Sequence, residues 1–156
     1  MHTRTLTLHV SQSIGTVSAE LLVPDEMSYL LTLAHGAGAG MNHSFIVGLS
    51  KALAAEGIGT LRFNFPYMEK KKKRPDVPSI AHATVEAALQ KAHELFAHVP
   101  VIASGKSFGG RMSSQWLALQ QHTFVKGVIF FGFPLHPAGK PAIERARSEE
   151  RRVGKE

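Results

Sequence analysis

The residues best suited to do chemistry lie in the stretch Gly105-Lys106-Ser107-Phe108-Gly109, which follows an apolar run ending at Ala103. This stretch matches G-x-S-x-G, the pattern of a nucleophile elbow, in which a serine occupies a sharp turn between a strand and a helix. The glycines two residues before and two after the serine leave room where the helix crosses the strand. The pattern therefore predicts that Ser107 is a nucleophile with its hydroxyl at the positive end of a helix dipole.

Two other kinds of turn also join a strand to a helix through glycines. A Walker-type phosphate loop needs a glycine five residues before Gly105, and Pro100 stands there, so that loop is excluded. The stretch would also suit a plain glycine-rich turn in which Ser107 merely caps the following helix. The residue types alone do not separate this capping interpretation from the nucleophile elbow.

A second glycine-rich segment, Ala34-His35-Gly36-Ala37-Gly38-Ala39-Gly40-Met41, follows the apolar run Tyr29–Ala34. If that run is the strand beside the Ser107 strand, the segment approaches the same site. The backbone amide of Ala37 would then be one oxyanion donor and that of Phe108 the other. One such donor typically lowers the barrier by roughly 3 kcal/mol. A dinucleotide loop, G-x-G-x-x-G, would need glycine where Met41 or His43 stands, so it is disfavoured.

Four further residues are candidates to line the site because they border these two segments. They are His35, Gly36, Lys106 and Arg111. We favour a loop-bracing or packing role for His35, because a catalytic histidine in this kind of enzyme follows the serine in the chain. Arg111 lies one helical turn after Ser107 and would either brace a loop or bind an acidic group of a substrate.

Hydrophobic patterning predicts strands that alternate with helices. Two alternating segments near the start indicate a hairpin, and Ser44 and Gly57 are expected to begin and end the first helix. The predicted strands are Thr5–Val10, Thr16–Val23, Tyr29–Ala34, Ile58–Phe65, Val101–Ala103 and Val125–Phe131, and the predicted helices are Phe45–Glu56, Ser79–His98 and Ser107–Gln121. This order favours an α/β fold, a three-layer α/β/α sandwich with a mostly parallel sheet.

Charge and composition limit the classes of partner. The net charge is +6, and Lys70–Arg74 supply five of these positive charges, so the basicity belongs to one loop and not to a face. A nucleic-acid-binding surface usually spreads its lysines and arginines and adds stacking aromatics. With no cysteine and no H-E-x-x-H, a metal or other cofactor is not expected. No stretch reaches the roughly 18 apolar residues that span a bilayer, so we expect a cytoplasmic protein without a membrane role.

Four motifs in this order resemble small bacterial α/β-hydrolases. They are A-H-G-A-G-A-G-M from Ala34, R-F-N-F-P-Y-M-E-K-K-K-K-R-P from Arg62, G-K-S-F-G-G-R-M-S-S from Gly105, and F-G-F-P-L-H-P-A-G-K-P from Phe131. This group includes a testis-expressed protein and the hydrolase-like domain of a non-specific-lethal chromatin complex subunit, and it is similar to dienelactone hydrolases. The resemblance, over about residues 5–147, implies an α/β-hydrolase fold with Ser107 as nucleophile, and it does not imply a substrate. With a serine nucleophile and an oxyanion hole, we expect the parent protein to transfer the acyl group of a small carboxylic ester or a related compound.

One departure from the hydrolase pattern concerns the base. That pattern places an acid and then a histidine after the serine. After Ser107 the chain has only His122 and His136, no aspartate, and carboxylates confined to a charged end: Glu144, Glu149, Glu150 and Glu156. We therefore expect residues 1–143 to be the N-terminal part of a truncated hydrolase domain, residues 144–156 to be a non-native or disordered tail, and the chain to be nearly inactive. The alternative function is a catalytically silent interaction module that docks through Lys70–Arg74.

Overall fold

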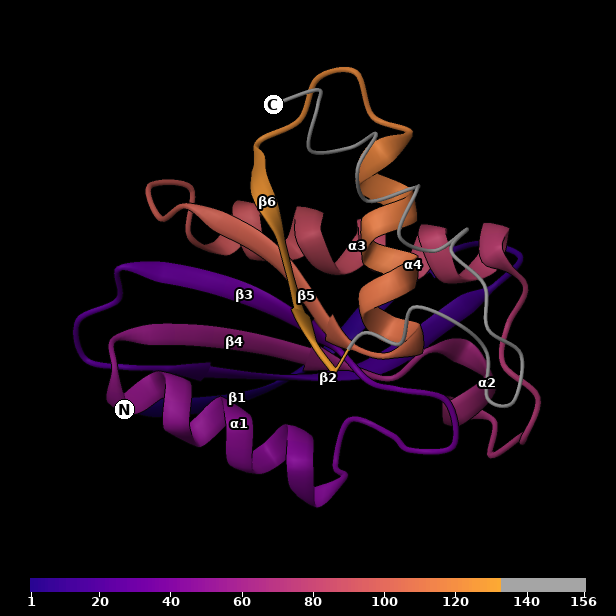
Figure 1. The fold of residues 1–156 in the computed structure, drawn as a ribbon, viewed down its shortest axis with the longest axis horizontal. Coiled ribbons are helices and arrows are strands. Elements are labelled where there is room, and N and C mark those ends of the chain that lie inside the picture. The colour runs from indigo at the N-terminus through magenta and orange to yellow at the C-terminus, as the bar shows by residue number, and fades with distance from the viewer. Residues whose placement is uncertain (133–156) are drawn as a thin grey trace.

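The computed structural model describes residues 1–132, which form one six-stranded sheet covered by helices (Figure 1). In chain order the elements are β1 His2–Ser11, β2 Gly15–Val23, β3 Tyr29–Ala34, α1 Ser44–Ala55, β4 Ile58–Phe63, α2 Pro66–Glu69, α3 Pro78–Leu95, β5 Val101–Lys106, α4 Phe108–Ala118 and β6 Val125–Phe131. The predicted tail and the domain boundary at residue 143 lie outside the described residues.

The sheet is mostly parallel, as predicted. Its strand order is β1-β2-β4-β3-β5-β6. The first two strands form the predicted antiparallel hairpin, and β2 joins β4 antiparallel. The pairs β3–β4, β3–β5 and β5–β6 are parallel. Because β3 and β5 are neighbours, the segment after Ala34 and the turn after Lys106 leave the same edge of the sheet.

The helices cover both faces of the sheet. α1 lies on one side, and α3 and α4 lie together on the other (Figure 1). Strands in the middle of the sheet are buried on both faces, which explains their continuous apolar runs, and Leu30, Leu33 and Leu61 are fully buried. α3 packs Val85 and Leu89 into the same core. The core therefore lies directly beneath the strand ends that carry the site.

Several predicted element ends were wrong for local reasons. β4 ends at Phe63 and not at Phe65, because the amide of Phe65 donates to the His35 ring, 3.0 Å away, instead of to a strand. The four-residue helix α2 was not predicted, and Pro66 occupies its first turn, a position that suits proline. At α1 the cap is His43 and not Ser44, since the His43 ring accepts from the Phe45 amide at 3.2 Å.

Boundaries of three further elements, β5, α4 and α3, also differ from the prediction. β5 runs on through Gly105 to Lys106, because both residues pair with β6. α4 therefore begins at Phe108, and it ends at Ala118 and not at Gln121. α3 ends at Leu95 and not at His98, because Phe96 leaves helical geometry at φ −137° and ψ 65°.

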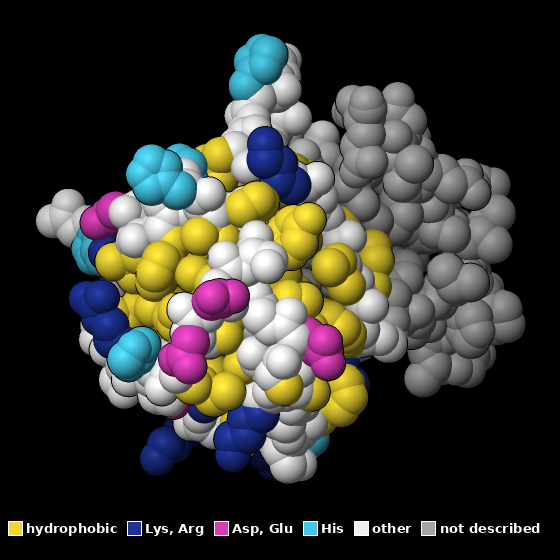
Figure 2. All heavy atoms as spheres, turned by 90° about the vertical axis from the view of Figure 1, so that its left-hand side faces the viewer, with side chains coloured by type: hydrophobic (Ala, Val, Ile, Leu, Met, Phe, Trp, Pro, Cys, Tyr) yellow, Lys and Arg dark blue, Asp and Glu magenta, His cyan; other side chains and the backbone are white. Residues whose placement is uncertain are grey.

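Figure 2 shows the molecule from the left-hand side of Figure 1, where α1 ends and β4 begins. Hydrophobic side chains lie there among acidic, basic and histidine side chains, so charges of both signs are interspersed. Within residues 1–132 no helix has both the length and the apolar character required to cross a bilayer.

Glycines allow close backbone contact at the corner between β5 and α4. A Cβ on Gly105 would lie 2.5 Å from the carbonyl carbon of Gly109. A Cβ on Gly109 would clash with the carbonyl oxygen of Ala34 and lie 2.6 Å from that of His35. The predicted contact of Gly105 with Gly109 is therefore present, but Gly109 itself faces the end of β3. This close approach fixes where α4 starts.

We expect Gly109→Ala to lower the free energy of unfolding by about 3 kcal/mol, because the new methyl would meet backbone atoms that cannot move aside. The matched control is Gly48→Ala, in the exposed part of α1, where a Cβ meets nothing within 4 Å. That change should raise stability by up to about 1 kcal/mol. Urea unfolding followed by circular dichroism measures both, and equal effects would contradict this account of the corner.

Candidate active site

Ser107 is the single residue between β5 and α4, and its backbone is strained. It has φ 52° and ψ −113°, and only one other non-glycine residue among those described, Lys71, has positive φ. Such a conformation costs on the order of 1–3 kcal/mol. The side chain of Ser107 makes no capping hydrogen bond to α4. The capping interpretation therefore gives no reason for a serine here, and the strain is not offset by a cap.

The Ser107 side chain borders a cavity of about 370 Å³. The other described residues that line it are Ala37, Pro75, Asp76, Pro78, Phe108, Arg111 and Met112. The structure thus brings together at one cavity the predicted nucleophile, both residues predicted to donate oxyanion amides, and Arg111. His35, Gly36 and Lys106 were also predicted to line the site, and they are not among the described residues that border this cavity.

The two predicted donor amides come from different parts of the sheet edge. Phe108 is the first residue of α4, so its N–H has no acceptor within the helix. The first amide of that helix to bond back is Arg111, which donates to the carbonyl oxygen of Ser107 at 2.9 Å. Ala37 belongs to a turn closed by the amide of Ala39 and the carbonyl of Gly36, in which Gly38 has φ 79°. That angle suits glycine at the third position of a turn.

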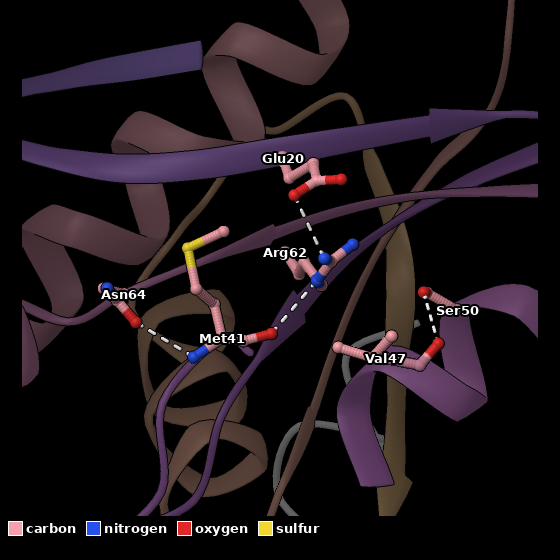
Figure 3. Close-up of polar contacts among 6 residues, drawn as sticks. All are labelled: Glu20, Met41, Val47, Ser50, Arg62 and Asn64. Atoms are coloured by element: carbon pink, nitrogen blue, oxygen red, sulfur yellow. Dashed lines mark hydrogen bonds and ion pairs between the residues drawn. The ribbon is translucent and has the colours of Figure 1, made fainter. Parts of the chain in front are cut away.

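The segment that carries Ala37 is fixed at Met41 by the side chains of β4 and its continuation (Figure 3). The carbonyl of Met41 accepts from Arg62 Nε at 3.0 Å, and its amide donates to Asn64 Oδ1 at 2.9 Å. Arg62 also pairs with Glu20 at 3.1 Å, which compensates its largely buried charge. Both backbone groups of Met41 are therefore held by one strand.

Glu69 of α2 extends this network to β2. One carboxylate oxygen accepts from the amide and hydroxyl of Ser18 at 3.1 and 2.6 Å, and the other accepts from Asn64 Nδ2 at 2.8 Å. Burial alone would raise the pKa of Glu69, but these hydrogen bonds outweigh burial and lower it. Sequence reasoning missed this network. The available signal was the alternation of Arg62 and Asn64, which places both side chains on one face of a strand.

His35 fixes the start of the same segment. It is fully buried, with Nδ1 2.8 Å from the carbonyl oxygen of Gly36 and Nε2 accepting from the amide of Phe65. The ring also meets the edges of Phe65 and Tyr67. Burial lowers the pKa of His35 to about 4, although the Gly36 carbonyl opposes this change. The neutral ring, with Nδ1–H donating, satisfies both bonds, in agreement with the loop-bracing interpretation.

The charged residues around Ser107 occupy different places. The Arg111 guanidinium lies 5.9 Å from the centroid of the Phe108 ring and borders the cavity. The ammonium of Lys106 lies instead over the ring of Phe45, 4.3 Å from its centroid. Asp76, which sequence reasoning missed, borders the cavity, and its carboxylate accepts from the amide of Tyr67 at 2.9 Å.

No histidine is among the described residues that line the cavity. His122 follows the far end of α4, an 11-residue helix and hence about 16 Å long, so it lies far from Ser107. His136 and the four late glutamates lie outside the described residues. Among residues 1–132 no three His, Asp or Glu side chains are grouped so that they could hold a metal ion. Among the described residues, the cavity therefore brings together Ser107, the residues Ala37 and Phe108, and the charged residues Asp76 and Arg111, without a histidine.

Comparisons with known proteins bear on the family and the fold of the chain. Residues 27–152 match a family model described as an alpha/beta hydrolase domain. An alpha-beta serine hydrolase homologue from Coxiella burnetii superposes with a TM-score of 0.71 and 24% identity, covering 86% of this chain and 65% of that one. A dienelactone hydrolase from Anabaena variabilis gives 0.70 and 17%, covering 83% and 62%. An esterase from an Arctic intertidal metagenomic library gives 0.65 and 18%, covering 82% and 59%.

These structural likenesses, at their low identities, show the fold. The chain spans less than two thirds of the length of each of the three neighbours. A search of curated proteins found no match. The narrower resemblance to the testis-expressed protein and the chromatin complex subunit stays a prediction.

The lowered pKa of His35 predicts acid sensitivity. Between pH 6.5 and about 4 the His35 imidazole is protonated in the unfolded chain but stays neutral in the folded protein. The free energy of unfolding therefore falls as the pH falls through this window. The loss attributable to His35 is about 3 kcal/mol. We expect His35→Gln to be less stable at pH 7 and to show a smaller loss between pH 6.5 and 4. Chemical denaturation at several pH values measures both proteins, and parallel pH profiles would refute the assignment.

Proposed function

The chain belongs to the alpha/beta hydrolase domain family, and from that premise we propose that it carries the nucleophile half of a serine hydrolase. The reaction is acyl transfer from a carboxylic ester, or a related acyl bond, of a small substrate in the cytoplasm. Ser107 is the nucleophile, and the amides of Ala37 and Phe108 bind the oxyanion. Gly105 and Gly109 form the elbow that holds the serine in place.

The observation that carries this proposal is the conformation of Ser107. Ser107 lies beside a cavity at φ 52°, a conformation that lowers the stability of the fold, and its side chain makes no capping bond that would compensate. Observed strain of this kind supports a functional role. The dipole of α4 and the free N–H of its first residue favour negative charge close to the serine.

The proposed reaction has two steps. The hydroxyl oxygen of Ser107 attacks the acyl carbon, its proton passes to a base, and the carbonyl oxygen becomes an anion held by the two amides. The bond to the leaving alcohol then breaks, the alcohol takes the proton, and water later releases the acid from the acylated serine. No histidine that could act as this base is among the described residues at the cavity. We propose that the acid and histidine follow Ser107 outside the described residues, in the order that the fold uses.

The second candidate is the catalytically silent interaction module. The observation that favours it is the absence of a histidine from the described lining of the cavity. Losing members of a serine triad costs on the order of 10⁴ to 10⁶ in turnover. The two candidates therefore differ in whether Ser107 reacts when a base is supplied.

We expect a fluorophosphonate probe to label the 156-residue chain slowly, and the rate to rise with added imidazole, because imidazole supplies the missing base. Intact mass spectrometry follows the adduct, and peptide mapping should place it on Ser107. Ser107→Ala should abolish labelling, whereas Ser13→Ala, at an exposed hairpin hydroxyl, should leave it unchanged. A folded chain that stays unlabelled at every imidazole concentration would favour the silent module.

A further inference from the structure

The end of α2 has an unusual backbone at Lys71. The amide of Lys72 donates to the carbonyl of Tyr67 at 2.8 Å, and that of Lys71 donates to Met68 at 3.0 Å. These two bonds form the Schellman motif that ends many helices. The motif places one residue in the left-handed region, usually glycine, and here Lys71 occupies it with φ 58°. The chain thus keeps a lysine where glycine would be less strained.

The reversal at Lys71 places consecutive lysines around a cavity. This cavity has a volume of about 540 Å³, and Gly38, Met68, Lys71, Lys72 and Lys73 line it. Gly38 follows Ala37, which borders the Ser107 cavity. The same turn, residues 36–39, therefore contributes to both cavities, and the lysine cavity lies next to the candidate oxyanion site.

Within the described part of the chain, the lysines at this cavity form no ion pair with an acidic side chain. None of the ion pairs found within residues 1–132 includes a member of Lys70–Arg74. The two nearest acids along the chain are occupied elsewhere: Glu69 by Ser18 and Asn64, and Asp76 by the amide of Tyr67. On the face shown in Figure 2, by contrast, charges of both signs are interspersed. Grouped, unpaired ammonium groups attract anions.

We propose that the lysine cavity binds the anionic end, a carboxylate or a phosphate, of the substrate that Ser107 attacks. The assignment to a substrate rests on the proposed function, whereas anion binding itself does not. Three ammonium groups supply donors for the anionic oxygens, and Met68 supplies an apolar wall. The described lining has no aromatic ring on which a nucleotide base could stack, so a small anion fits better than a nucleic acid.

Anion binding is tested by calorimetric titration of the full chain with inorganic pyrophosphate and, separately, glutarate. We expect wild type and Ser107→Ala to bind alike, and Lys72→Gln/Lys73→Gln to bind on the order of tenfold more weakly. The matched control is Lys51→Gln/Lys126→Gln, which removes two exposed charges from α1 and β6. Equal weakening by both pairs, or no binding by wild type, would overturn the proposal. If the chain binds duplex DNA and pyrophosphate does not displace that DNA, the small-anion proposal is wrong and a nucleic acid is the partner.

Lys71→Gly separates anion binding from folding. Glycine relieves the left-handed strain, so the melting temperature should rise by about 2–4 °C while pyrophosphate binding weakens. A gain in both stability and binding would contradict the role of this side chain.

The substrate assignment is tested by acylation of Ser107 with two p-nitrophenyl esters in imidazole, the neutral butyrate and the anionic hemiester of glutaric acid. Lys72→Gln/Lys73→Gln should slow acylation by the hemiester on the order of tenfold and leave the butyrate unchanged. Equal slowing of both esters would overturn the substrate assignment. If neither ester acylates Ser107 while pyrophosphate still binds, the proposed function is wrong and the anion is not the end of its substrate.

Discussion

The candidate site depends on how closely two stretches of backbone approach at the corner between β5 and α4. Side chains at Gly105 and Gly109 would strike the start of α4 and the end of β3. Their absence lets α4 begin one residue after Ser107, so its first free amide and the serine share one cavity. Because Gly109 faces the carbonyls of Ala34 and His35, the same contact also fixes where the Ala37 segment leaves the sheet. One steric constraint thus positions both halves of the site.

The rest of the site is fixed by polar groups that do not themselves face the cavity. Neutral His35 holds the start of the Ala37 segment, and Arg62 and Asn64 hold its end at Met41. Glu69 joins this network to β2. These groups are buried or half-buried and mostly paired, so each would be costly to leave without its partner. Preorganised amides are effective because they need not reorient when charge develops on an oxyanion.

Much of the fold could be predicted because the buried strands and long helices have strong periodic patterns. The order of the six strands and three long helices and the hairpin were confirmed, and the strands before Gly36 and Ser107 are neighbours, the condition on which the expected site depended. Strand and helix ends were less predictable, since they depend on distant partners, as where Phe65 leaves the sheet to bond His35. The G-x-S-x-G motif located the turn at Ser107. The hydrogen bonds of Asn64 and Glu69 join segments that are distant in the sequence, so no local sequence pattern predicts them.

The segment between His35 and Met41 is tied down at both ends, and this limits how the site can vary. Only residues 36–40 lie between the two attachments, and their turn has the Ser107 cavity on one side and the lysine cavity on the other. Ala37 and Gly38, at the exposed tip of this turn, border one cavity each. Because both attachments are fixed, a change in the length of the segment falls on this tip, and it would alter the rims of the two cavities together.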